Sequence, residues 1–249
     1  MIKRSWLRVL LALGFVFTVA SAVPALAAIQ YSGSLQAPKT NGLDGTGYWV
    51  NAENPVTFSW LVSEVGVQNG AILWNYAYTI SAPAGASSHV IIELSDGFTV
   101  NDISNIRFNG TPIEECVYDD DTSRWEISNF SQGGSNPYMK DGLFGIKINT
   151  PNDNSNLITT YSFDSTHAPV WGDFYSKDGM ANSNVFNTAW NEGFLRTDPT
   201  ADPTNGSIDN HILRPDTVEQ PSVPEASSML LGALGLMPVL GMSIRKWRK

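Results

Sequence analysis

Aromatic residues are dense between residues 163 and 194, and amide and carboxylate residues are interleaved with them. The flat faces of aromatic rings suit the apolar C–H faces of pyranose sugars, while neighbouring polar groups can pair with the sugar hydroxyls. Trp171, Tyr175 and Trp190 are therefore candidate contacts for a glycan. The alternative is that these rings form the core and edge packing of the domain.

Established catalytic motifs are missing from the sequence, which contains no Gly-x-Ser-x-Gly elbow, phosphate loop or dinucleotide fingerprint. His89, His167 and His211 show no metal-binding spacing, so each is expected at a strand end and no metal site is predicted. The many acids could supply the carboxylate pair of a glycosidase, but their abundance singles out no pair. We therefore predict a non-catalytic protein with no catalytic residues and no cofactor, and a secreted carbohydrate-active hydrolase remains an alternative.

Two acidic segments are candidates for calcium binding. Within residues 202–209, placing Gly206 at the sharp turn of a calcium loop leaves Ala201 and Pro203 where oxygen ligands are needed, so an Asn-Gly turn is favoured. The acids of residues 114–121 could gather a hard cation, although adjacent like charges more often mark a solvated turn. A calcium-dependent adhesin therefore remains a second alternative.

The charge of the chain excludes one class of partner. Once both termini are set aside, eight basic and 23 acidic residues remain, which gives a net charge of −15. A field of this sign repels phosphate backbones, so nucleic acid is not an expected partner.

Alternating apolar and polar residues dominate the middle of the chain. Residues 56–62 and 74–80 are the clearest examples, and Val90, Ile92 and Leu94 continue the pattern. Turn sequences separate the strands, and Asn109-Gly110 is the best candidate for a tight hairpin. Strands at this spacing without helical patterns predict an all-β fold, an antiparallel, jelly-roll-like β-sandwich of eight or more strands over residues 28–214.

The end of this body changes in composition. Residues 208–214 are apolar enough to form a last strand, and the Pro-rich residues 215–222 are expected to be an extended tether. Such a tether would leave the segment after it accessible to a peptidase.

The N-terminus has the features of a secretory signal peptide. A basic region is followed by an apolar stretch over residues 9–22, and Ala25 and Ala27 provide the small residues that signal peptidase requires. Residues 1–27 are therefore predicted to be removed during export.

The C-terminus combines a short acidic motif, an apolar stretch and a basic end. Residues 227–244 carry no charge, and as a helix they would reach about 27 Å, enough to span a bilayer. The motif before them and the basic residues after them are Val223, Pro224, Glu225, Ala226 and Arg245, Lys246, Arg248, Lys249. Because cationic flanks stay on the cytoplasmic side, this transmembrane helix would place the body outside the cell.

This three-part tail, residues 223–249, resembles the PEP-CTERM sorting domain of exported bacterial proteins. Ala226 stands where the commonest form of the motif has a second Pro. The resemblance implies that an exosortase-type peptidase reads the motif, removes the helix and passes the protein to the cell surface or an exopolysaccharide-rich extracellular matrix. An ordinary C-terminal anchor is the alternative reading of the same residues.

Together these features predict an exported, non-catalytic surface or matrix protein that is first anchored by its C-terminal helix and then processed. Signal peptidase and an exosortase-type peptidase are its expected partners, and exopolysaccharide is a candidate ligand.

Overall fold

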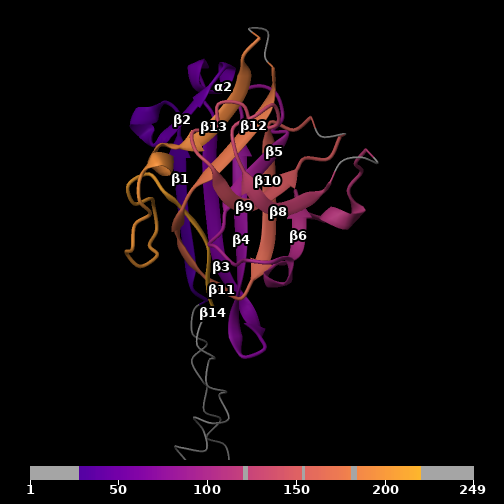
Figure 1. Ribbon diagram of the computed structural model, residues 1–249, viewed down its shortest axis with the longest axis vertical. Helices are drawn as coiled ribbons and strands as arrows, with labels where there is room; N and C mark the ends of the chain where they lie inside the picture. The colour runs from indigo at the N-terminus through magenta and orange to yellow at the C-terminus, as the bar shows by residue number, and fades with distance from the viewer. Residues whose placement is uncertain (1–27, 120–122, 153–154, 181–183, 220–249) are drawn as a thin grey trace, which may run out of the picture.

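The computed structural model describes residues 28–119, 123–152, 155–180 and 184–219. Within these ranges the chain forms an all-β fold of fourteen strands, one short α-helix and four 3-10 turns (Figure 1). The strands are β1 (Gln30–Gln36), β2 (Leu43–Thr46), β3 (Thr57–Gln68), β4 (Ala71–Ser81), β5 (His89–Glu93), β6 (Ser104–Phe108), β7 (Thr111–Pro112), β8 (Trp125–Phe130), β9 (Leu143–Asn149), β10 (Ile158–Ser165), β11 (His167–Gly172), β12 (Phe174–Met180), β13 (Phe186–Asn191) and β14 (Ile212–Glu219). The helical segments are η1 (Lys39–Asn41), α2 (Tyr48–Asn51), η2 (Val100–Asp102), η3 (Ile113–Glu115) and η4 (Glu192–Leu195).

The predicted signal peptide (1–27) and sorting segment (223–249), with its helix at 227–244, lie outside the described residues. Across the described ranges, no helix has the length and apolar character that crossing a membrane requires.

Three antiparallel sheets make up the fold. The first sheet has the strand order β1-β3-β4-β10-β6-β7, and the second has the order β2-β13-β12-β5-β9-β8. The third is a two-stranded sheet of β11 and β14. In Figure 1, β3 and β4 run along the long axis of the molecule, and they pair over nearly their whole length.

The alternation predicted for β3 and β4 is confirmed. Phe58, Trp60 and Val62 of β3 are buried, and so are the four residues Trp74, Tyr76, Tyr78 and Ile80 of β4. Residues with even spacing point to one face of a strand, so these side chains line the inner face of the first sheet. The Asn109-Gly110 hairpin is confirmed as well, because both residues have positive φ between β6 and β7.

The core joins the first and second sheets. The ring of Phe58 on β3 stacks on that of Phe174 on β12, with centroids 3.6 Å apart and planes inclined by 14°. Both residues belong to one apolar cluster that also includes Val90 and Ile92 of β5 and Tyr161 of β10. The two six-stranded sheets therefore share one apolar core.

Strand β5 departs from the predicted alternation, because Ile91 is buried as completely as Val90 and Ile92. Ile91 packs on the other face of the second sheet, in a smaller cluster that includes Phe130, Met139, Leu143, Tyr175, Trp190 and Phe194. A strand that is covered on both faces reads as a continuous apolar run. The second sheet therefore has a second, smaller core on its outer side.

The two-stranded sheet is fastened to β4 by tyrosine hydroxyls. Tyr76 donates to the carbonyl of His167 (2.8 Å), and Tyr78 donates to the carbonyl of Leu213 (3.0 Å). These bonds fix β11 and β14 against the first sheet.

The end of the body lies further along the chain than predicted. The strand expected at 208–214 begins instead at Ile212 and continues to Glu219, through residues assigned to the tether. Pro215 lies opposite Pro169 in the ladder. A two-stranded sheet consists of edge strands alone, where a residue without an N–H is tolerated, so Pro215 does not end β14.

Candidate functional site

The three candidate glycan residues are buried. Trp171, Tyr175 and Trp190 expose only 1%, 0% and 3% of their surface. Trp171 Nε1 donates to the carbonyl of Ala201 (3.1 Å), and the Tyr175 hydroxyl donates to the carbonyl of Pro137 (2.6 Å). The interpretation of these residues as glycan contacts is therefore wrong, and the alternative of core packing holds. For Tyr175 and Trp190 periodicity could not reveal this, because it does not show that the outer face of the second sheet is covered. Trp171 on β11 belongs to the main core instead.

Trp190 does border a small hollow of about 210 Å³, together with Lys140 and Glu192. The ammonium of Lys140 lies 4.8 Å from the centroid of the Trp190 ring, in a cation–π contact. This contact occupies a ring face that a sugar would need.

A larger groove, of about 850 Å³, lies where α2 meets the β12–β13 hairpin. Tyr48 and Met180, which expose 50% and 60% of their surface, line it together with Asn51, Asp178 and Asn187. The groove thus combines an accessible aromatic ring with amide and carboxylate groups.

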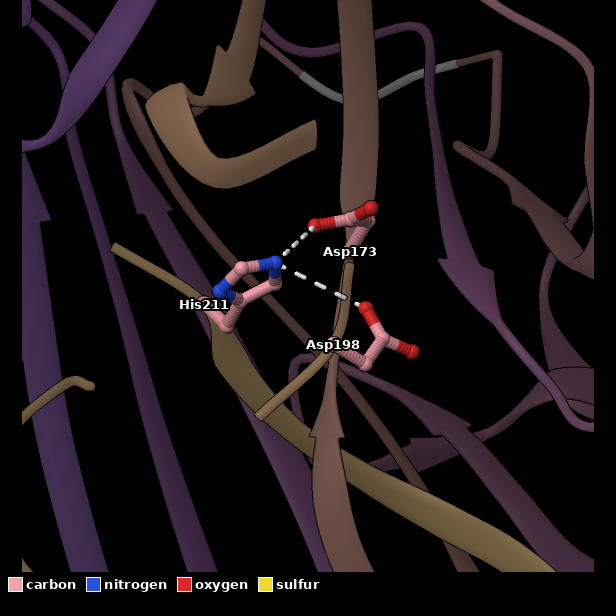
Figure 2. A group of neighbouring side chains, drawn as sticks. All are labelled: Asp173, Asp198 and His211. Carbon is pink, nitrogen blue, oxygen red and sulfur yellow. Dashed lines mark ion pairs between the residues drawn. The ribbon is translucent and has the colours of Figure 1, made fainter. Parts of the chain in front are cut away.

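Asp173, Asp198 and His211 form a group whose candidate metal-ligand atoms all lie within 4.8 Å of one another (Figure 2). His211 Nε2 lies 3.6 Å from Asp173 Oδ1 and 3.6 Å from Asp198 Oδ1. Figure 2 shows both carboxylates directed toward the same edge of the imidazole ring. We refer to these three residues as the Asp-Asp-His cluster.

Three separate segments bring this cluster together. Asp173 stands between β11 and β12, Asp198 follows η4, and His211 directly precedes β14. Hydrogen bonds hold down the long segment between η4 and β14: Ala201 accepts from Trp171, and Gly206 N donates to the carbonyl of Ser32 on β1 (2.8 Å).

Two glycines leave the space that His211 and Arg214 occupy. A Cβ atom on Gly193 would lie 2.7 Å from Cε1 of His211, and one on Gly172 would lie 2.1 Å from Nε of Arg214. Contacts this short are forbidden, so a side chain at either position would push the neighbouring residue away.

A buried polar network surrounds the cluster. Asn191 Nδ2 donates to Asp173 Oδ1 (2.5 Å), and the backbone N–H of Asp173 donates to Glu93 Oε2 (2.7 Å). Arg214 Nη2 donates to Asp198 Oδ2 (3.0 Å) and to Glu93 Oε1 (3.4 Å). The guanidinium therefore lies between the carboxylates of Glu93 and Asp198.

Burial shifts the titration of these groups. Desolvation raises the pKa of Asp173 to about 7. The charge of Asp198 also raises this pKa, whereas the hydrogen bond from Asn191 and the charge of Arg214 lower it. Desolvation likewise raises the pKa of Glu93 to about 7, against the lowering effect of Arg214. Burial lowers the pKa of His211, so the neutral imidazole is favoured.

The other two histidines are not part of this cluster. His89 and His167 stand at the starts of β5 and β11, at strand ends as predicted, but they are buried rather than half-buried. His167 Nε2 lies 3.3 Å from Asp102 Oδ1, and the ring of His89 contacts that of Tyr175.

Sequence reasoning considered His211 by itself and did not connect it with Asp173, Glu93, Asp198 or Arg214. No local spacing links these residues. Gly172 and Gly193 are the residues that come nearest to marking the cluster in the sequence. Sequence alone does not distinguish them from glycines in turns.

Ala25, Ala27, Val223–Ala226 and the basic residues 245–249 lie outside the described residues, as do Asp120 and Asp121 of the acidic segment. Comparisons of the chain with protein-family models, with curated proteins and with solved structures find no match.

Proposed function

We propose that this chain is an exported, non-catalytic protein of the cell surface or extracellular matrix, sorted through its PEP-CTERM-like tail. The observation that carries the proposal is the tail itself, with Pro224-Glu225 beside an uncharged 18-residue stretch and a basic end. In this proposal signal peptidase removes residues 1–27, and the C-terminal helix anchors the protein until an exosortase-type peptidase cuts it.

The limits of the fold support this proposal. The first strand begins at Gln30, three residues after the predicted signal cleavage site, and the last ends at Glu219, four residues before Val223. Every described strand thus lies between the two hydrophobic segments, within the residues that would remain after both cuts.

We also propose that the body is a β-sandwich of jelly-roll-like type. The chain passes from β4 in the first sheet to β5 in the second, back to β6, and on to β8 in the second sheet. Repeated crossing between two sheets that share one core is typical of this architecture.

Enclosure of the Asp-Asp-His cluster supports a non-catalytic role. His211 is completely buried, Asp173 is nearly so, and the side chain of Asp198 is only 30% exposed. A polymeric substrate could not reach the imidazole without displacing the segment between η4 and β14. Such enclosure favours a binding or structural protein over the hydrolase alternative.

The mass of the mature protein tests the proposal. Intact mass spectrometry of protein recovered from membrane and matrix fractions should show a matrix form that begins near Ala28 and ends near the motif. A Pro224→Ala/Glu225→Ala variant should keep its tail and stay in the membrane fraction, whereas Gln220→Ala/Pro221→Ala, a matched change outside the motif, should be processed normally. Finding the uncut chain in the cytosol would contradict the proposal.

Glycan binding is a second candidate, and the groove at Tyr48 favours it over the buried aromatic residues. An exposed ring next to Asn51 and Asp178 offers both the stacking face and the polar partners that a sugar needs. Soluble exopolysaccharide should bind the protein without release of reducing ends. Tyr48→Ala should abolish binding, while Tyr138→Ala, which removes an exposed tyrosine elsewhere, should not. Reducing ends that appear with the wild type and disappear with Asp178→Asn would instead establish a hydrolase.

A further inference from the structure

We propose that Asp173, Asp198 and His211 bind a divalent transition-metal ion, for which Zn²⁺ is the natural probe. This inference does not depend on export or sorting. It concerns a structural metal that would hold the segment between η4 and β14 against the corner of β11 and β12.

The orientation of His211 is the first argument. Its Nδ1 lies 3.3 Å from the carbonyl oxygen of Ile208. A carbonyl can only accept a hydrogen bond, so Nδ1 carries the proton and, in a neutral ring, Nε2 presents its lone pair. A ligand histidine usually donates its other N–H to a backbone carbonyl or carboxylate in this way.

The surroundings of Nε2 are the second argument. His211 is fully buried, and Nε2 has no hydrogen-bond partner. The atoms nearest to it in the cluster are carboxylate oxygens, which are acceptors too, so the neutral ring faces them lone pair against lone pair. A cation between these three groups would satisfy all of them at once.

The distances fit a metal ion. Nε2 is 3.6 Å from an oxygen of each carboxylate, and the three ligand atoms all lie within 4.8 Å of one another. A point equidistant from atoms separated in this way is about 2 to 2.4 Å from each, close to Zn–N and Zn–O bond lengths of about 2.0–2.2 Å. Only small side-chain adjustments would be needed.

Charge balance is the third argument. Arg214 pairs with Glu93 and Asp198, and Asp173 lies beside Asp198 in the cluster around His211, so two negative charges are not offset when all three carboxylates are ionised. Unpaired buried charge is costly, and a divalent ion would offset both charges.

The ligand types select the class of metal. One imidazole nitrogen and two carboxylates suit Zn²⁺ or Mn²⁺, whereas Ca²⁺ prefers a shell made of oxygen atoms alone. The site proposed here thus differs from the calcium alternatives considered for the acidic segments.

Zinc titration of the exported protein tests the proposal. The protein is first stripped of metal with EDTA and then freed of the chelator. One Zn²⁺ should bind per chain by isothermal titration calorimetry and elemental analysis, in preference to Ca²⁺. Asp198→Asn keeps the side-chain shape but removes a ligand charge, and should weaken Zn²⁺ binding by at least about tenfold. Asp202→Asn, the same change on the same segment but outside the cluster, should bind Zn²⁺ like the wild type. Equal affinity of the two variants, or preference for Ca²⁺, would overturn the proposal.

A spectroscopic measurement avoids variants altogether, which matters because His211 substitutions could prevent folding. In protein labelled with ¹⁵N-histidine, Zn²⁺ should shift the Nε2 resonance of one ring and leave its Nδ1 protonated, while His89 and His167 stay unchanged. Zinc-induced shifts at His89 or His167 alone, or no shift at saturating Zn²⁺, would refute the assignment.

Discussion

The stacked rings of Phe58 and Phe174 connect the two six-stranded sheets at a centroid distance of 3.6 Å. Neither ring is accessible to solvent, so truncation would leave a cavity between the sheets. Phe174→Ala should reduce the free energy of unfolding by about 3–5 kcal/mol, measured by urea titration. Leu61→Ala, at an exposed position of β3, should change it by less than about 0.5 kcal/mol. A small loss for Phe174→Ala would mean that the sheets do not depend on this contact.

Gly193 gives a steric prediction. A methyl group at this position would lie 2.7 Å from Cε1 and 2.8 Å from Nδ1 of His211, so Gly193→Ala must displace the imidazole. We expect a loss of about 1–3 kcal/mol in unfolding free energy, as for other overpacked sites. Gly133→Ala is the control, because a Cβ there would contact nothing within 4 Å. Equal stability of the two variants would contradict the prediction, because it would show that the His211 ring can move aside at no cost in free energy.

His89 predicts a dependence of stability on pH. Burial lowers its pKa well below the ordinary value, and the charges of Lys147 and Lys177 lower it further. Unfolding restores a pKa of about 6.5, so below that pH the unfolded chain binds a proton that the folded chain does not. The contribution of the neutral ring is therefore complete above about pH 6.5 and is lost as the pH falls, by up to about 1.4 kcal/mol per pH unit.

The His89→Gln variant isolates this effect, because other titrating groups contribute equally to both proteins. Urea unfolding at pH 8 and pH 5, with chelator present, should show the wild type losing at least about 1 kcal/mol more than the variant on acidification. Parallel pH profiles would contradict the prediction.

Substitutions of Arg214 and Glu93 should have coupled effects on the free energy of unfolding. Its guanidinium compensates Glu93 and Asp198, so Arg214→Met should cost about 3–5 kcal/mol by leaving buried carboxylates without a cation. Glu93→Gln removes one of these charges. In a double-mutant cycle the combined variant should therefore lose less than the sum of the single losses, by about 1 kcal/mol or more. Additive losses would indicate that the two residues do not interact.

The parts of the fold that sequence predicted are those set by local patterns. Alternation in β3 and β4 identified which side chains face the core, and Asn109-Gly110 located a hairpin because its turn needs positive φ at both residues. The burial of Ile91 could not be foreseen, because it depends on the distant residues 130–143 covering the outer face of β5.

The Asp-Asp-His cluster was inaccessible to sequence reasoning for a related reason. Its members come from the corner between β11 and β12, from the segment after η4, and from the start of β14. Only tertiary packing brings them together, through contacts such as Trp171 with Ala201. Asp198 stands in a stretch without apolar periodicity, which offers no indication of what it will face.

The pairing of β14 has a mechanical consequence. Among the described strands, β14 forms its ladder with β11 alone, and Glu219 at its end lies opposite His167 at the start of β11. Tension transmitted along the polypeptide from beyond Glu219 would therefore load this short ladder first and open it pair by pair toward Ile212. Because Ile212 and Leu213 also belong to the main apolar core, opening the ladder as far as Ile212 would expose part of that core as well.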